Sequence, residues 1–155
     1  MISELEPVWK QFTETYDALR QALAQVPEDR LHWQPTPGAT SVDGITRHIV
    51  SGNLAYSSMI AEGHRNVVRP REPAPNRERL LELLDTSEQR VKTVFEQLSA
   101  QDLCLPRADG WMPLGVEVSG PLDVLWFAQQ IVRHSAYHLG QINYILLLLD
   151  SDATA

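Results

Sequence analysis

Two histidines four residues apart, His134 and His138, lie within a mostly apolar segment, residues 131–149. Its apolar residues recur at spacings of three and four, which predicts a buried or half-buried helix. The Cβ atoms of residues i and i+4 on such a helix lie about 5 to 6 Å apart. Two imidazoles at this spacing can bind one zinc ion at distances of about 2.0 to 2.1 Å. The pair is therefore a candidate metal site.

A third ligand is expected from a second helix. His48 follows Ile45 by three positions and directly precedes Ile49, on the apolar side of a helix predicted over residues 42–62. Gly52, one turn later, leaves room beside it. Three histidine ligands leave coordination positions open to water or substrate, which is typical of a catalytic zinc site rather than a structural one.

Each of these residues also has a simpler interpretation. A single histidine on an apolar helix face is more often a hydrogen-bonded core residue than a ligand, and this interpretation is favoured for His48 alone. For His134 and His138, a shared metal ion and two hydrogen-bonded core histidines are equally supported. Without a metal, each buried imidazole would need its own hydrogen-bond partner. Taken together, the three histidines favour a metal. Gln141, one turn beyond His138, either orients a ligand or lines the pocket, or is a solvated or structurally bonded glutamine.

Four segments with the apolar period of a helix position these residues. They are residues 3–26, 42–62, 76–98 and 121–149. Pro27 ends the first segment, Ser41 and Gly63 bound the second, and Asn76 and Pro121 open the last two. Each segment has one strong apolar face, and strand signals are nearly absent. The sequence therefore predicts an all-α fold, a four-helix bundle.

The connections between these helices are irregular. The loop of residues 63–75, about 44 Å long when stretched, can run the roughly 33 Å length of a helix and cross the bundle. His32 and His64 lie in or beside loops and are expected to be exposed. The segment 99–119 permits a short extended piece around 116–118. Within it, Trp111 either covers the pocket or anchors the loop on the core, and the anchor is favoured.

Length and charge exclude several classes of protein. A chain of 155 residues with 43% hydrophobic and 21% charged residues suits a single soluble domain covering residues 1–155. Thirteen basic against twenty acidic residues give a net charge of −7, the wrong sign for binding nucleic acid or anionic lipid. The expected partners are a small-molecule substrate and neither nucleic acid nor a membrane.

The expected location is the cytoplasm. The N-terminus lacks the pattern of a signal peptide, and the longest aliphatic run is five residues, against about 20 needed to cross a bilayer. The single cysteine, Cys104, cannot form an internal disulfide. It is expected at the end of the third helix as a small buried apolar residue rather than a nucleophile.

Two motifs together resemble the DinB-like superfamily of metal-dependent proteins, which includes thiol-dependent S-transferases and related isomerases. They are LHWQPTPGATSVDGITRHIV, residues 31–50, and HSAYHLGQINYILLL, residues 134–148. The likeness covers nearly the whole chain, and the combination of a proline-rich turn, a Ser-initiated helix with one histidine, and His-x3-His followed by Gly-Gln is more specific than either motif.

The resemblance implies an up-down-down-up bundle, frequently dimeric, that binds zinc, nickel or another divalent metal through His48, His134 and His138. A homodimer is therefore expected. Many relatives carry an arginine directly after the last histidine, where this chain has Leu139. This departure leaves the predicted ligands in place but weakens any inference about substrate.

Three functions remain open from the sequence. The first is a transferase in which the metal activates a low-molecular-weight thiol as a thiolate nucleophile. The second is a metal-dependent hydrolase, which ranks lower because no carboxylate lies on the helix face of the histidines. No general base is assigned among Glu62, Asp109, Glu117 and Asp123. The third is a non-enzymatic dimeric module that binds metal or responds to stress. The apolar character of the fourth helix suits either a subunit interface or the centre of a single bundle.

Overall fold

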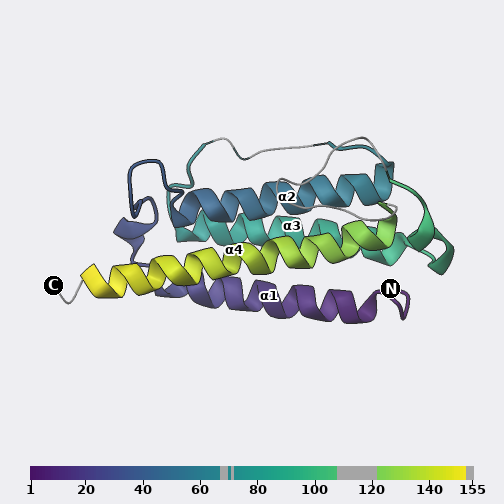
Figure 1. Ribbon diagram of the computed structural model, residues 1–155, viewed down its shortest axis with the longest axis horizontal. Coiled ribbons are helices and arrows are strands. Elements are labelled where there is room, and N and C mark those ends of the chain that lie inside the picture. Colours follow the sequence, from purple (N-terminus) through teal and green to yellow (C-terminus); the bar gives the residue numbers. More distant parts are fainter. Residues whose placement is uncertain (67–69, 71, 108–121, 153–155) are drawn as a thin grey trace.

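The computed structural model describes residues 1–66, 70, 72–107 and 122–152, and four α-helices make up most of this part of the chain (Figure 1). The helices are α1 (Glu6–Gln25), α2 (Val42–Glu62), α3 (Arg77–Gln97) and α4 (Val124–Asp152). Two 3-10 helices, Glu28–Arg30 (η1) and Ala100–Cys104 (η2), follow α1 and α3. The predicted four-helix fold is confirmed.

The predicted boundary residues of α2 and α3 cap these helices. The Ser41 hydroxyl accepts a hydrogen bond from the Gly44 amide at 3.2 Å, and the Asn76 side chain accepts one from the Arg79 amide at 3.0 Å. Gly63 ends α2 with a positive φ of 75°, and its amide bonds to the Met59 carbonyl. These local signals explain why the predicted and observed boundaries of α2 coincide.

The start of α4 differs from the prediction. The helix begins at Val124 and not at Pro121, which lies outside the described residues. Asp123 forms an isolated β-bridge with Pro106, and its carboxylate accepts a hydrogen bond from the Trp126 amide at 2.8 Å. Asp123 therefore acts as the N-terminal cap of α4, a local role that the apolar period does not reveal.

The helices follow an up-down-down-up course. Figure 1 shows α1 and α4 running in one direction and α2 and α3 in the other. The connection from α2 to α3 must therefore return along α2. Three contacts trace this return: Asn66 bonds to Ser58, the Pro70 carbonyl to Arg47, and the Ala74 amide to Asp43. The connection therefore crosses the bundle lengthwise, as the length of the loop allows.

A buried polar cluster joins all four helices inside a mostly apolar core. The Tyr16 hydroxyl of α1 lies 2.7 Å from Ser87 Oγ of α3, and Asn53 Nδ2 of α2 donates to Tyr16 at 2.7 Å and to Ser135 of α4 at 3.0 Å. All four residues are buried, and burial raises the pKa of Tyr16 to about 12. Because each group has a partner, the cluster fixes the helices in one register.

Other predictions outside the helices have mixed outcomes. His32 and His64 are exposed, as expected. Cys104 is exposed, so its predicted burial is wrong: it ends η2, a turn that places Leu103 in the core instead. The segment 116–118 lies outside the described residues. Among the helices described, none combines the length and apolar character that a membrane span requires.

Candidate metal centre

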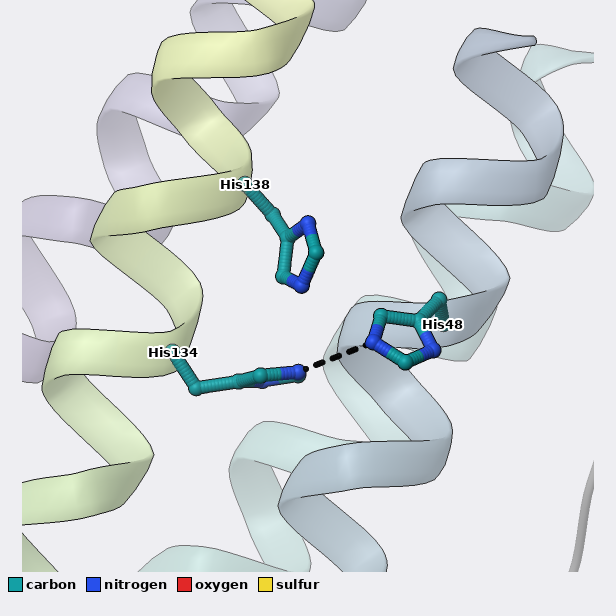
Figure 2. Close-up of side chains that lie close together, drawn as sticks. All are labelled: His48, His134 and His138. Carbon is teal, nitrogen blue, oxygen red and sulfur yellow. Dashed lines mark hydrogen bonds between the residues drawn. The ribbon is translucent and has the colours of Figure 1, made fainter. Parts of the chain in front are cut away.

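The structure brings the three predicted histidines together. Figure 2 shows His134 and His138 reaching from α4 toward His48 on α2. One nitrogen of each imidazole lies within 4.8 Å of the corresponding nitrogens of the other two. In the described part of the chain, this is the only group of three or more His, Cys, Asp or Glu side chains placed closely enough to hold a metal ion.

The nitrogen-to-nitrogen spacing fits a shared metal ion. The Nε2 atoms of His134 and His48 are 3.2 Å apart. Two nitrogens bound tetrahedrally to zinc at about 2.0 to 2.1 Å lie about 3.3 to 3.4 Å apart. The same spacing also allows an N–H···N hydrogen bond between one protonated and one unprotonated imidazole. The pair therefore needs little movement to exchange a shared proton for a metal ion.

His134 is held by the shape of its surroundings. A Cβ atom added to Gly52 of α2 would lie 2.3 Å from His134 Cε1 and 2.9 Å from each ring nitrogen. The Tyr56 ring packs edge-on against the imidazole, with centroids 5.6 Å apart. The prediction that Gly52 leaves room for the site is therefore supported by geometry. His134 Nδ1 is buried and has no hydrogen-bond partner among the described residues.

His138 is held by a hydrogen bond. Its Nδ1 lies 2.6 Å from the side-chain oxygen of Gln141, and the Gln141 amide nitrogen lies 3.4 Å from the Tyr137 hydroxyl. The Tyr137 ring also packs edge-on against His138, at 5.0 Å between centroids. Gln141 is thus bonded to a candidate ligand and is not simply solvated.

The electrostatics keep the imidazoles of α4 neutral. Burial, together with the nearby His138 and His48, lowers the pKa of His134 to about 3. Burial also lowers the pKa of His138, although the bond to Gln141 opposes the change. Neutral imidazole is the form that binds metals. Near neutral pH both side chains can therefore offer a lone pair without first losing a proton.

The three side chains differ in exposure. His134 and His138 are half-buried, whereas His48 is exposed. The site therefore lies where α2 and α4 meet the surface, with its deep side formed by α4 and Gly52. An ion held there would be reachable from the side of His48, which leaves space for a further ligand.

The other candidate residues do not join this cluster. Glu62 forms an ion pair with Arg90 at 3.1 Å, and Asp123 caps α4. Trp111, Asp109 and Glu117 lie outside the described residues. Cys104 lies in η2 and does not belong to the group around the histidines.

Sequence reasoning missed the roles of Tyr56, Tyr137 and Asn53. Tyr137 lies four residues before Gln141 on one helix, so the i,i+4 spacing signals their contact. The proximity of Tyr56 to His134 depends on how α2 packs on α4 and has no local signal. Asn53 resembles any polar residue in the sequence, because its two partners, Tyr16 and Ser135, lie on other helices.

Comparisons with known proteins agree with this architecture. A family model described as the DinB superfamily matches residues 11–142. The crystal structure of a DinB-like protein from Bacillus subtilis is similar, with a TM-score of 0.73 and 15% identity, covering 94% of this chain and 93% of that one.

A conserved protein from Enterococcus faecalis gives a TM-score of 0.73 at 15% identity, covering 97% of this chain and 99% of that one. No curated protein matches the sequence. At this identity the similarity to the two solved structures concerns the fold.

Proposed function

This chain belongs to the DinB superfamily, and from that membership together with its three converging histidines we propose that it is a metal-dependent enzyme. His48, His134 and His138 would hold one divalent ion, with zinc or nickel the best suited to imidazole nitrogen. The proposal depends chiefly on one observation, the 3.2 Å approach of His48 and His134 from different helices beside His138.

The donor set suits a catalytic role. Three neutral nitrogen ligands leave the full positive charge of an ion uncompensated and leave its coordination incomplete. When bound, a divalent ion acidifies whichever group takes the open position, a thiol in a transferase or water in a hydrolase. The exposed side of His48 gives such a group access, while Gly52 and Tyr56 hold the deep side closed around His134.

We favour a thiol S-transferase whose cosubstrate is a low-molecular-weight thiol. A hydrolase would benefit from a general base, and neither Glu62 nor Asp123 lies at the site. Cys104 lies apart from the histidines, so the nucleophile would come from the small thiol. Such thiols stay reduced in the cytoplasm, which is the location we propose.

Metal content tests the ligand assignment. Purified wild type should contain about one divalent ion per chain by elemental analysis after reconstitution, whereas His48→Ala and His138→Ala should contain little. His64→Ala is the matched control, because His64 is an exposed histidine outside the cluster. Full metal content in both ligand variants, or none in the wild type, would contradict the proposal and leave the non-enzymatic module.

Turnover separates the two enzymatic alternatives. Metal-loaded protein is incubated with a generic electrophile, with and without small thiols. We expect consumption of the electrophile that requires both the metal and a thiol. Turnover that follows metal content without any thiol would instead favour the hydrolase. Metal binding without turnover in either assay would favour the metal-binding module.

We also propose that the protein forms a homodimer through α4. Residues 135–149 contain no Asp, Glu, Lys or Arg, yet Tyr137, Tyr144 and Leu147 on this helix are 65%, 62% and 64% exposed. Two copies that each carry a net charge of −7 repel least where they meet through an uncharged face. An exposed apolar face of this kind is typical of an interface.

A further inference from the structure

We infer that Gln141 is a positioning residue for the proposed metal site: its side-chain oxygen accepts a hydrogen bond from Nδ1–H of His138 and so leaves the Nε2 lone pair of His138 free for the ion. The inference rests on the proposed metal binding and extends it to a side chain that would not touch the metal. Its geometric basis is the 2.6 Å separation between Gln141 Oε1 and His138 Nδ1.

The hydrogen bond to Gln141 determines which nitrogen of the neutral His138 imidazole carries the proton. One ring nitrogen carries the proton and the other carries the lone pair, and a partner on either nitrogen selects the tautomer. The Gln141 oxygen can only accept, so His138 must place its proton on Nδ1. Nε2 is then unprotonated and available. Were the amide turned around, its NH₂ group would select the opposite tautomer, with a proton on Nε2.

The surroundings hold Gln141 in this place. Its amide nitrogen lies 3.4 Å from the Tyr137 hydroxyl, and the Tyr137 ring packs against His138. All three side chains come from two successive turns of α4, at spacings of three and four that bring them onto one face. The arrangement therefore depends on one helix and not on the packing of two.

The contrast with His134 shows why this bond matters at His138. His134 is enclosed by Gly52 and Tyr56, and its Nδ1 has no partner among the described residues. His138 instead has a side-chain partner at Nδ1, the oxygen of Gln141 at 2.6 Å. Packing orients the first imidazole, whereas the second depends on Gln141. Loss of Gln141 should therefore disorder one ligand and leave the other in place.

Zinc affinity, measured by competition with a chromophoric chelator, tests the inference. Gln141→Leu removes the acceptor, and we expect zinc binding to weaken about 10- to 100-fold, the usual effect of losing a partner of a metal-bound histidine. Gln141→Glu keeps an acceptor, so its affinity should equal or exceed that of the wild type. Asn143→Leu, an equivalent change at an exposed amide of the same helix, is the matched control and should leave affinity unchanged.

A spectroscopic measurement distinguishes positioning from a general structural effect. Cobalt(II) is added as the only metal, and the paramagnetically shifted, exchangeable imidazole N–H resonances are recorded by NMR. The Nδ1–H signal of His138 should be sharp in the wild type and in Gln141→Glu. It should broaden or vanish in Gln141→Leu, because its proton would then exchange with water.

The outcomes separate this inference from the proposed function. Absence of metal binding by the wild type, or unaltered binding by His138→Ala, would refute the metal site itself. If His138→Ala loses zinc binding as expected but Gln141→Leu binds zinc as tightly as the wild type, only the role of Gln141 would be overturned. Tighter binding by Gln141→Leu would also overturn it, since the amide would then be opposing the required tautomer.

Discussion

Replacing Gly52 with alanine should displace a metal ligand without touching any ligand residue. The added Cβ would lie 2.3 Å from His134 Cε1, whereas ordinary van der Waals contacts begin at 3.4 Å. The imidazole must therefore retreat by about 1.1 Å, the difference between these distances. The helix backbone is stiffer than a side-chain torsion, so we expect the ring to move and α2 to stay in place.

The size of the effect follows from the tolerance of metal coordination. Metal–ligand distances vary by only about 0.2 Å, so a shift of about 1.1 Å removes His134 from the ion. We expect zinc affinity to fall at least about 100-fold, equivalent to about 2.7 kcal/mol. The free energy of unfolding of the metal-free protein should change by less than this. Overpacking costs about 1 to 3 kcal/mol, but the higher helix propensity of alanine recovers up to about 1 kcal/mol.

Gly140→Ala is the matched control. Gly140 also lies inside a helix, and nothing lies within 4 Å of a Cβ added there. This variant should gain roughly 1 kcal/mol of stability and keep wild-type zinc affinity. Affinity is measured by chelator competition and stability by urea denaturation. A folded Gly52→Ala protein that binds zinc as tightly as Gly140→Ala would refute the reasoning that His134 is positioned by the space at Gly52.

Three further outcomes are expected. The metal-free protein should lose stability as the pH falls below about 6.5. In this range His134 binds a proton in the unfolded chain but stays neutral in the folded one, where its pKa is about 3. The free energy of unfolding, measured by urea titration, should fall by roughly 1.4 kcal/mol per pH unit, and by less in His134→Leu. Tyr16→Phe removes the hydroxyl that bonds to both Asn53 and Ser87 in the core and should cost about 1 to 3 kcal/mol in the same assay, so an unchanged midpoint would argue against the four-helix cluster. Tyr144→Lys combined with Leu147→Glu should convert a dimer to a monomer in light scattering, and a dimer that persists in this folded variant would place the interface elsewhere.

The helices and the histidine cluster were predictable because their signals are local. Apolar spacing of three and four located four helices, and capping residues such as Ser41 and Gly63 fixed the ends of α2. His134 and His138 share a face because of the helical period alone. The choice of His48 as their partner needed only that α2 present its apolar side to α4.

Features that depend on several helices at once were not predictable. The partners of Asn53 lie on α1 and α4, and nothing in its neighbourhood in the sequence identifies them. Cys104 was expected to be buried because free cysteines usually are, but Leu103 is the buried residue of η2 and Cys104 is exposed. The bond from Gln141 to His138 depends on side-chain torsions, which the helical spacing permits but does not select.

The distance along the chain between the two halves of the histidine cluster constrains how a metal would be acquired in the cell. His48 and His134 are separated by 86 positions, and α4 is synthesised after α1, α2 and α3. During translation His48 leaves the ribosome long before its partners exist. A chelate of all three imidazoles can form only when α4 packs on α2, so the complete metal site would be one of the last parts of the bundle to form.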